Sequence, residues 1–363
     1  MRALARVSLG AIERNCARLA AVAAPARLCA VVKADGYGHG AVAAARAAQA
    51  GGAPWLGVAT AAEAFELRAA GIGGPVLVMG ALSAAELDVA VEADADVVAW
   101  REDFVRVLAA RARVRVIGVH VKLDTGMGRL GTRDPEEAAR VADLVAATDG
   151  VRLAGAMTHF ATADEDDDTF MREQLAVFRP WAARLAEPGV LVHAANSAAT
   201  LRDPAARFDM VRCGIAIYGM DPFHRDPADH GLEPALELVS YVAEVKRAQP
   251  GQSAGYGRRF VAERETWIGT IPIGYGDGVR RDLTDNADVL VGGRRVPLVG
   301  TVSMDNITVD LGDEPVERGT EAVLIGARAG ERILAEELAA RIGTINYEVT
   351  CGISARVPRE HRD

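Results

Sequence analysis

The sequence LCAVV at residues 28–32 runs directly into KADGYGHG at residues 33–40. A short apolar run bounded by turn-forming residues is typical of a buried strand, and the alternating glycines after it indicate a sharp loop that opens a helix. Lys33 therefore stands at the end of a predicted core strand. Partial loss of water there favours the neutral amine, which suits Lys33 to a Schiff base or to proton transfer. The alternative is a lysine that merely leaves the core at a strand end.

The overall composition is that of an ordinary globular protein, with 363 residues of which 50% are hydrophobic and 25% charged. This length suffices for two domains. A net charge of -9 without a sustained basic block argues against nucleic acid or an anionic membrane as the main partner. The first residues lack the apolar core of a signal peptide, and the longest uncharged run, 69–85, contains four glycines and a proline. We therefore expect a cytoplasmic protein without a membrane span.

The cysteines give no sign of a metal site or of disulfide bonds. The chain has four of them, Cys16, Cys29, Cys213 and Cys351, and no two lie close in sequence. Such scattering is typical of a reducing compartment and offers no metal-ligand spacing. We expect neither a disulfide nor a zinc site.

Short apolar runs alternate with Ala-rich, Leu-containing stretches of helical character over the first two thirds of the chain. The eight runs are 28–32, 55–59, 76–79, 97–100, 116–123, 153–158, 190–192 and 210–211. Alternation of this kind predicts a parallel sheet, and the number of runs favours a closed (β/α)8 TIM-like barrel over an open doubly wound sheet. After about residue 230 the segments 239–245, 266–271, 287–291, 296–301, 307–310 and 321–325 are strand-like. This second part is predicted to be mostly β, with one late helix near 334–342.

Polar side chains follow several of the predicted barrel strands, at the end where barrel enzymes build their active sites. They are Lys33, then Lys122 with Asp124, His159, His193 with Asn196 and Ser197, and Arg212 with Cys213, Gly214 and Ile215. A barrel that is only structural needs no such ring of polar residues, so the set predicts a functional site. Taken singly, each residue is a weak signal, and a lone histidine such as His159 is more often a satisfied polar residue than a catalyst.

The segment 212–215 lies where phosphate sites often form in barrels, after the seventh and eighth strands. Gly214 would let backbone N–H groups approach an anion closely, and Ser197 could add a hydroxyl donor. A lysine at one strand end and a phosphate cradle at another form the arrangement that pyridoxal phosphate needs, with the lysine holding the aldehyde as an imine. An ordinary strand-to-helix turn is the alternative for this segment.

Arg129 lies in the glycine-rich loop that follows Lys122 and could hold a substrate carboxylate through two parallel hydrogen bonds. A surface arginine is the alternative. Five of the six tyrosines lie in Gly-rich or polar motifs, among them Tyr256 and Tyr275 in the second part of the chain. From there they could reach a barrel mouth in the same chain or in a partner, unless they only cover a surface.

Taken together, these segments resemble the alanine racemase family, in the family's order and over nearly the whole chain. The matching segments are 33–40, 123–129, 158–160, His193 with 196–197, 212–215, 273–278, 302–305 and 347–348. The resemblance implies a fold type III pyridoxal-phosphate enzyme. Its barrel, residues 10–232, binds the cofactor, and a mostly β domain, residues 1–9 and 233–363, supplies the catalytic tyrosine of the partner subunit. It also implies a homodimer with shared active sites and alanine as the small-molecule substrate.

The resemblance assigns catalytic roles to four residues. Lys33 becomes the cofactor lysine and the base or acid on the D-face of the substrate, and Tyr256 of the partner subunit becomes the base on the L-face. One group would remove the Cα proton and the other would return a proton on the opposite face. His159 would help the tyrosine to ionise. Arg212, in contact with His193, would face the pyridine nitrogen and leave it unprotonated, because arginine does not readily release a proton.

The resemblance also assigns binding roles. The cofactor-binding residues are Tyr37, His193, Asn196, Ser197, Gly214, Ile215 and Tyr347. Arg129 and the backbone of Met304 would bind the substrate carboxylate, and Tyr275 with Tyr347 would narrow the entry, with Asp164 nearby. Lys122 matches a lysine that is often carbamylated in the family and then orients Arg129.

Two departures from the family pattern are Cys213, where proline is usual, and Ser303, where cysteine is common. Neither removes a catalytic group. The expected function is interconversion of L- and D-alanine for peptidoglycan. The alternatives are a racemase of broader specificity, a barrel-type amino-acid decarboxylase and a non-catalytic carrier of pyridoxal phosphate.

Overall fold

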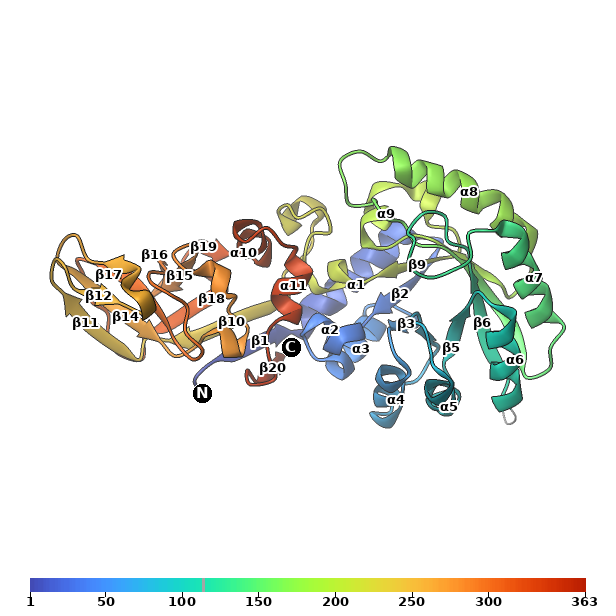
Figure 1. Ribbon diagram of the computed structural model, residues 1–363, viewed down its shortest axis with the longest axis horizontal. Helices are drawn as coiled ribbons and strands as arrows, with labels where there is room; N and C mark the ends of the chain where they lie inside the picture. Colours follow the sequence, from blue (N-terminus) through green and yellow to red (C-terminus); the bar gives the residue numbers. More distant parts are fainter. Residues whose placement is uncertain (113–114) are drawn as a thin grey trace. The chain divides into compact units, whose positions relative to one another are not determined.

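The computed structural model describes residues 1–112 and 115–363. The chain divides into two compact units (Figure 1). The barrel unit comprises Ile12–Tyr37 and Ala41–Phe223, and the β unit comprises Met1–Ala11, Gly38–Gly40 and His224–Asp363.

Parallel strands form a nearly closed barrel in the barrel unit. The eight strands are β2 (Arg27–Val31), β3 (Trp55–Val58), β4 (Val76–Val78), β5 (Asp96–Ala99), β6 (Ile117–Lys122), β7 (Val151–Met157), β8 (Leu191–His193) and β9 (Met210–Cys213). Their order in the sheet is β8-β7-β6-β5-β4-β3-β2-β9. Hydrogen bonds connect its two ends: Asp209 N donates to Val192 O (3.0 Å) and Arg212 N donates to Ala195 O (2.9 Å). The predicted (β/α)8 barrel is confirmed.

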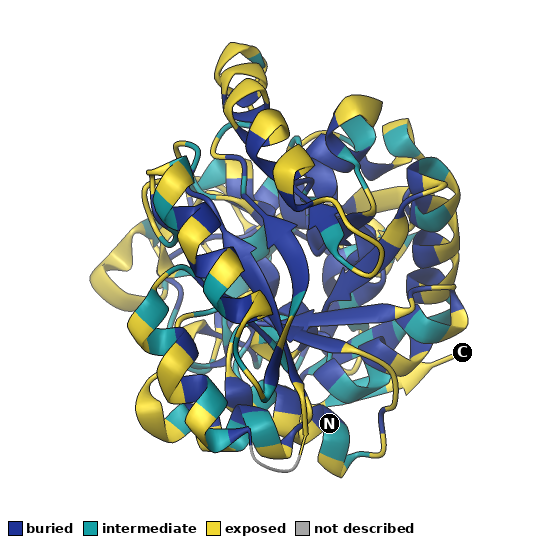
Figure 2. Ribbon diagram, turned by 90° about the vertical axis from the view of Figure 1, so that its right-hand side faces the viewer, coloured by how far each residue is buried: buried dark blue, intermediate teal, exposed yellow. Residues whose placement is uncertain are grey.

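Helices connect the strands and surround them. They are α1 (Leu9–Ala23), α2 (Lys33–Tyr37), α3 (Ala41–Ala50), α4 (Ala61–Ala69), α5 (Ala84–Glu92), α6 (Glu102–Arg111), α7 (Pro135–Ala146), α8 (Thr169–Leu185) and α9 (Ser197–Arg202). Figure 2 shows buried strands inside helices whose outer faces are exposed. Every residue of β3, β4 and β6 is buried, as expected for parallel strands covered by helices. Capping boxes begin α4 at Thr60 and α5 at Ser83, which satisfies backbone N–H groups of each first turn.

The β unit contains twelve strands and two late helices. The strands are β1 (Leu4–Ser8), β10 (Leu236–Tyr241), β11 (Glu244–Ala248), β12 (Ser253–Ala254), β13 (Phe260–Val261), β14 (Thr266–Ile271), β15 (Asp288–Val291), β16 (Arg294–Pro297), β17 (Ile307–Gly312), β18 (Glu321–Arg328), β19 (Glu331–Ile333) and β20 (Arg359–Arg362), and the helices are α10 (Ala335–Arg341) and α11 (Asn346–Cys351). The largest sheet runs β16-β15-β18-β10-β1-β20, with β19 paired to β18. Smaller sheets are β11-β14-β17 and β12-β13. The first residues add a strand to this unit, as the resemblance implied: β1 pairs with β10 and β20.

Several expected elements of the β unit were wrong in detail. The single strand expected at 239–245 is two strands, β10 and β11, which belong to different sheets. The strand expected at 296–301 ends at Pro297, and Gly300 then adopts a positive φ of 75°. One late helix was expected, but α11 follows α10. With only six residues, α11 is too short to show a helical period and contains the β-branched Val349 and Thr350.

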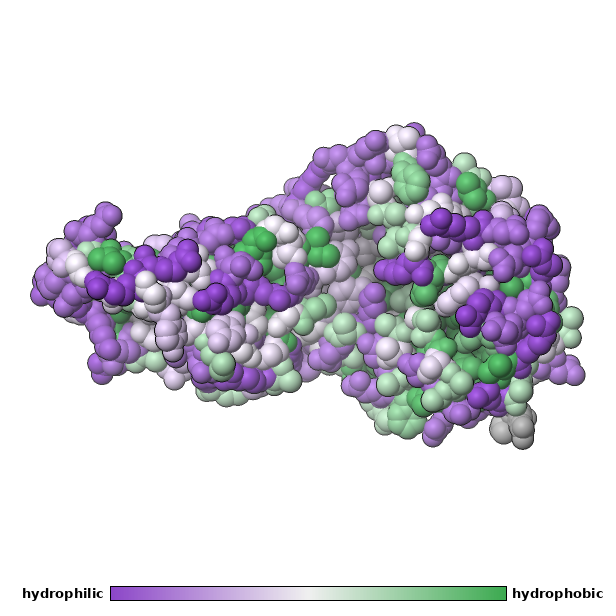
Figure 3. Space-filling model, viewed as in Figure 1, coloured by the Kyte–Doolittle hydropathy of each residue, from purple (hydrophilic) through white to green (hydrophobic). Residues whose placement is uncertain are grey.

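No helix within the described residues is long and apolar enough to span a membrane. On the face drawn in Figure 3, the β unit is mostly hydrophilic, with hydrophobic residues scattered among the polar ones.

Candidate functional site

A cavity of about 210 Å³ in the barrel unit brings together five of the residues predicted from the sequence. It is lined by Lys33, Lys122, Arg129, His159 and Arg212, together with Ala59, Met79, Gly80, Leu130 and Met157. Lys33, Lys122, His159 and Arg212 belong to the ends of β2, β6, β7 and β9 or to the residues that follow these ends. Four members of the polar ring expected at the carboxyl ends of the barrel strands therefore line one cavity, and the other members lie outside its lining.

Lys33 follows the last ladder hydrogen bond of its strand, in which Val32 N donates to Gly57 O (2.8 Å). The next residues make an unusual left-handed turn, with φ values of 53° at Ala34, 51° at Asp35 and 54° at Tyr37. Left-handed backbone costs a non-glycine residue roughly 1–2 kcal/mol, so such strain persists only where the surroundings impose it. The turn places the Lys33 Nζ atom 6.0 Å from the centre of the Tyr37 ring.

Hydrogen bonds from outside the turn hold this backbone. Glu63 Oε1 accepts from Ala34 N (2.8 Å), and Asp35 Oδ1 accepts from Ala41 N at the start of α3 (2.9 Å). Glu63 is also the third residue of the capping box of α4, so one carboxylate fixes both the helix start and the turn that carries the lysine. The sequence indicated a sharp loop here but not its left-handed form.

Tyr37, Ser197 and Gly214 converge beside one another. Ser197 Oγ accepts from the backbone N–H groups of Gly214 (3.0 Å) and Ala216 (3.4 Å). A Cβ atom at Gly214 would overlap the hydroxyl of Tyr37, so only glycine lets these groups meet. Asn196 caps α9 by accepting from Ala199 N (2.9 Å) and thereby fixes the position of Ser197. Ile215, which was predicted with them, is buried at the start of the 3-10 helix Ile215–Tyr218.

Arg212 lies buried at the centre of a group of hydrogen bonds. Its Nη1 atom donates to His193 Nδ1 (2.7 Å), and its Nη2 atom donates to Thr158 O (2.8 Å) and His159 Nδ1 (3.1 Å). Burial lowers the pKa of Arg212 to about 10, which still leaves the guanidinium charged at neutral pH. Burial and the charge of Arg212 lower the pKa of both His159 and His193 well below the usual value. Both histidines are therefore neutral at neutral pH.

Lys122 is a buried cation among other cations. Burial and the charges of Arg212 and Arg129 lower its pKa to about 8, although Asp124 acts in the opposite direction. Asp124 shapes the loop that carries Arg129 by accepting hydrogen bonds from Gly126 N (3.1 Å) and Gly128 N (3.0 Å). The side chain of Lys122 is only 4% exposed, so its charge has little access to water.

Tyr256, Tyr275, Met304 and Tyr347 belong to the β unit and do not line the cavity of the barrel unit. Tyr256 begins the 3-10 helix Tyr256–Arg258 and is 74% exposed. Tyr275 is 43% and Met304 52% exposed, and they are neighbours because Gly276 N donates to Met304 O (2.9 Å). Tyr347 lies in α11, with its ring centre 6.3 Å from that of His224. Tyr256, Tyr275 and Met304 are therefore accessible on the surface of the β unit.

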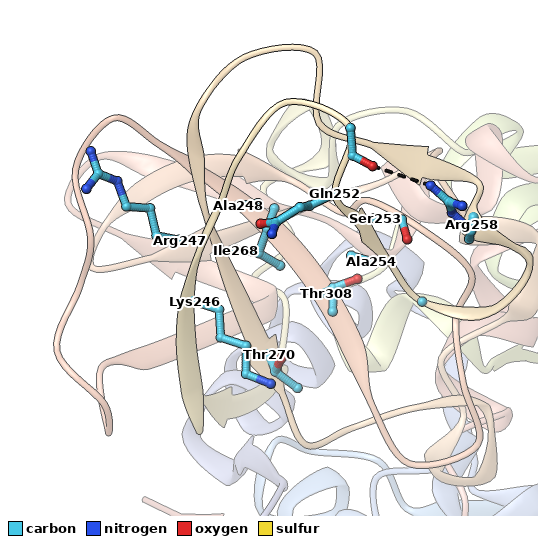
Figure 4. A pocket seen from close by; sticks show the side chains of 12 residues that line it. Lys246, Arg247, Ala248, Gln252, Ser253, Ala254, Arg258, Ile268, Thr270 and Thr308 are labelled. Atoms are coloured by element: carbon cyan, nitrogen blue, oxygen red, sulfur yellow. Dashed lines mark hydrogen bonds between the residues drawn. The ribbon is translucent and has the colours of Figure 1, made fainter.

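A second cavity, of about 550 Å³, lies on the β unit beside Tyr256 (Figure 4). Its lining includes the cationic residues Lys246, Arg247 and Arg258, and no acidic residue among those described. Arg258 Nη2 donates to Gly251 O (3.3 Å) and so braces the rim next to the tyrosine. Arg247 forms an ion pair with Glu265, so Lys246 and Arg258 supply the positive charge of this hollow.

Two residues that support the site were given no role in it by the sequence analysis, although Tyr218 is one of the five tyrosines in Gly-rich or polar motifs. The ring of Tyr218 lies 5.1 Å from that of Tyr37, and its hydroxyl donates to Val31 O (3.1 Å), so it supports both the strand and the turn. Gln174 Nε2 donates to His159 O (3.1 Å) from α8. The sequence did contain a signal for Gln174, because a glutamine among the apolar residues of a helix face indicates a buried hydrogen-bonding role.

Comparison with known proteins covers the whole chain. Residues 7–222 match the family "Alanine racemase, N-terminal domain" and residues 235–361 match "Alanine racemase, C-terminal domain". The alanine racemase of Symbiobacterium thermophilum is 43% identical over 98% of this chain and 96% of its own length, and that of Thermobifida fusca is 43% identical with the same coverage. The crystal structure of alanine racemase from the D-cycloserine producer Streptomyces lavendulae is similar with a TM-score of 0.94 at 39% identity, over 100% of this chain and 97% of that one. This chain, with its barrel and its mostly β unit, belongs to the alanine racemase family.

Proposed function

We propose that this protein is a pyridoxal-phosphate-dependent alanine racemase that interconverts L- and D-alanine in the cytoplasm and supplies D-alanine for peptidoglycan. The observation that carries the proposal is the cavity in which Lys33, Arg129 and Arg212 meet. It combines an amine, a carboxylate-binding guanidinium and a second, buried guanidinium. A cavity of this kind suits an amino acid attached to a cofactor. Family membership over the full chain supports the same reaction.

The residues present fit pyridoxal phosphate. The hydroxyl groups of Tyr37 and Ser197 are donors of the kind that a phosphate requires; Ser197 Oγ accepts from Gly214 N, which leaves its own proton for the phosphate, and a Cβ at Gly214 would overlap the Tyr37 hydroxyl. Ile215, Asn196 and Tyr347 would complete this end. Lys33 would hold the aldehyde end, and Arg212, supported by His193, would face the ring nitrogen. When bound, the cofactor acts as an electron sink that makes the Cα proton of an amino acid acidic.

Racemisation needs two proton-transfer groups on opposite faces of the substrate carbon. We assign Lys33 Nζ to the D-face and Tyr256 Oη of the partner subunit to the L-face. His159 suits the tyrosine because its Nδ1 atom accepts from Arg212, which leaves the proton of the neutral ring on Nε2. An Nε2–H group that donates to the phenolic oxygen would stabilise the ionised tyrosine.

Arg212 would influence the reaction because its guanidinium keeps its proton. A guanidinium donates hydrogen bonds but does not readily release a proton, so Arg212 would leave the ring nitrogen of a bound cofactor unprotonated. The cofactor would then be a weaker electron sink, which would disfavour transamination. A barrel-type decarboxylase would normally carry an acidic residue in place of Arg212, so that alternative ranks well below racemisation.

The exposed residues of the β unit support a homodimer with shared active sites. Tyr256, Tyr275 and Met304 are large and exposed, and the hollowed basic surface beside Tyr256 gives a second molecule room to approach. In the dimer, the backbone of Met304 would join Arg129 at the substrate carboxylate. Tyr275 and Tyr347 would narrow the entry near Asp164. A non-catalytic carrier of pyridoxal phosphate would need none of these residues.

Racemisation is tested by incubating the holoenzyme with each alanine enantiomer in deuterium oxide. We expect deuterium at Cα of both enantiomers, because the proton removed is replaced from groups that have exchanged with solvent. The equilibrium should be near one to one, because enantiomers have equal free energies in solution. Chiral chromatography with mass spectrometry measures both. A panel of serine, valine, lysine and arginine separates an alanine-specific enzyme from a broader racemase. Release of carbon dioxide without exchange of the Cα proton would contradict the proposal.

We also propose that Lys122 is carbamylated. The ammonium loses one proton to give the neutral amine, whose nitrogen then bonds to the carbon of carbon dioxide and releases a second proton to solvent. A pKa lowered to about 8 makes the neutral amine available near neutral pH. The addition changes a buried positive charge beside two arginines into a negative one, which removes repulsion from Arg129 and Arg212. The new carboxylate would orient Arg129.

Carbon-13 NMR of the holoenzyme in labelled bicarbonate is expected to give one carbamate signal. At constant dissolved carbon dioxide the signal should grow as the pH rises through about 8, because deprotonation produces the reactive amine. Lys122→Ala should lose the signal and raise the KM for alanine about tenfold, the effect of losing about 1.4 kcal/mol of binding. Lys246→Ala, at an exposed lysine, is the matched control. A signal that survives in Lys122→Ala would refute the assignment.

A further inference from the structure

Hydrogen bonds continue from Arg212 through the interior of the barrel to a carboxylate at its opposite end. Arg212 Nη1 lies 2.7 Å from His193 Nδ1, and His193 Nε2 lies 2.8 Å from His120 Nδ1. His120 Nε2 in turn lies 3.3 Å from Asp96 Oδ2. His120 stands in the middle of β6 and His193 at the end of β8, and both are fully buried. These four side chains, from Arg212 to Asp96, are called the barrel relay below.

The chemistry of arginine fixes the direction of every bond in the barrel relay. A guanidinium has donors but no acceptor, so His193 Nδ1 must accept and carries no proton. The proton of the neutral His193 is then on Nε2, where it is donated to His120 Nδ1. That leaves the His120 proton on Nε2, directed at the carboxylate of Asp96. Only one arrangement of protons satisfies all three contacts.

Two glycines in neighbouring strands make room for the barrel relay. A Cβ atom at Gly118 in β6 would overlap the carboxylate of Asp96, and one at Gly155 in β7 would overlap the His120 ring. Glycine inside a strand weakens it and often marks the close approach of another group. The ring of Trp55 packs edge-on against His120, with centres 5.7 Å apart. The barrel interior is thus shaped around these polar groups.

The far end of the barrel relay reaches the solvent side of the barrel. Asp96 is the first residue of β5, and its side chain is 14% exposed. Arg152 Nη2, half-exposed, lies 3.3 Å from Asp96 Oδ2. Burial alone would raise the pKa of Asp96, but the hydrogen bond from the neutral His120 and the charge of Arg152 outweigh it and lower that pKa. Asp96 therefore carries a negative charge at neutral pH.

We propose that Asp96 and His120 are positioning residues for Arg212, which orient its guanidinium and stabilise its charge from the opposite end of the barrel. A carboxylate that polarises two histidines in series strengthens each hydrogen bond in the chain. The His193 Nδ1 atom becomes a better acceptor and holds the buried guanidinium in one orientation. The inference rests on the proposed function, in which Arg212 faces the cofactor ring nitrogen.

Nitrogen-15 NMR of histidine-labelled holoenzyme tests the proton arrangement without relying on the reaction. The chain has seven histidines, so the signals of His120 and His193 can be assigned by their loss in His120→Gln and His193→Gln. We expect both rings to carry a proton on Nε2 and a bare Nδ1, with a strongly deshielded His120 Nε2 proton that moves upfield in Asp96→Asn. A His120 ring protonated on Nδ1 would overturn the proposal, even if the wild type racemises alanine. If the wild type did not racemise alanine, the proposed function would fail, but the expected tautomers of His120 and His193 could still be observed.

Kinetics then test the positioning role. Asp96→Asn should lower kcat by about tenfold to a hundredfold, the range typical for residues that orient an active-site ligand, with little change in KM. Gly118→Ala keeps every charge but displaces Asp96, so it should produce the same change in kcat. The matched control is Asp209→Asn, which removes a carboxylate at the same end of the barrel, bound to Val192 N (2.8 Å). Equal losses of kcat in Asp96→Asn and Asp209→Asn, or unchanged kcat in a folded Asp96→Asn, would refute the role.

Discussion

Replacing Lys33 with alanine is expected to reduce racemisation of alanine by about 10⁴-fold or more, the scale of loss seen when an essential covalent group is removed. The variant loses both the amine that holds the cofactor aldehyde and the proton-transfer group on the D-face. Exchange of the Cα proton should stop for both enantiomers. The measurement is deuterium incorporation at Cα, with thermal unfolding to show that the variant is folded.

Chemical labelling makes this test specific. The chain contains only three lysines, Lys33, Lys122 and Lys246. Borohydride reduction of the wild-type holoenzyme should fix the cofactor onto Lys33 alone, as peptide mass spectrometry would reveal. Lys246→Ala is the matched control and should keep the label and the activity. A label on Lys122, or a Lys33→Ala enzyme that still exchanges the Cα proton, would disprove the assignment of Lys33.

Replacing Tyr256 with phenylalanine is expected to remove proton abstraction from L-alanine while leaving the cofactor bound. The change deletes one hydroxyl and keeps the exposed ring, so the loss should be about 10²-fold to 10⁴-fold, the usual contribution of a general base. D-alanine should still exchange its Cα proton through Lys33. Deuterium incorporation, followed separately from each enantiomer, measures this asymmetry. Tyr241→Phe, at another exposed tyrosine, is the control and should change neither rate.

Mixing the two inactive variants tests whether the tyrosine comes from the partner. In a hybrid dimer of Lys33→Ala and Tyr256→Phe subunits, one of the two shared sites contains both defects and the other contains neither. The mixture should therefore recover part of the wild-type activity after subunit exchange. Complete absence of recovery in a verified hybrid dimer would mean that each site is built within one chain.

The positions of the barrel strands could be predicted because most of these strands are short apolar runs that are buried on both faces. Residues 76–78, for example, are apolar in sequence and completely buried in the structure. The strand β20, Arg359–Arg362, could not be found in this way because all its residues are polar or charged. β20 pairs with β1 through backbone hydrogen bonds, which any residue type can form, so the pairing leaves no pattern in the sequence.

The sequence also predicted which residues belong to the site, but it did not predict which side chains would surround each of them. Lys122 could be predicted as a site residue because it stands at the end of an apolar run. That its pKa is lowered depends on Arg129 and Arg212, which meet it only in the folded barrel. The left-handed turn after Lys33 depends in the same way on Glu63, a residue thirty positions further along the chain.

By itself, the sequence determined that a lysine, a histidine and an arginine stand at the ends of buried strands, since the local alternation of apolar and polar residues sets where a strand lies and where it ends. Only the tertiary structure decided which inward-facing side chains meet. His120 is one polar residue within an apolar strand until barrel closure places it between His193 and Asp96, which are 73 and 24 positions away. Closure of the barrel sets such contacts because the stagger of neighbouring strands determines which residues share a level inside it. The local pattern of apolar and polar residues in the sequence does not indicate how neighbouring strands are staggered.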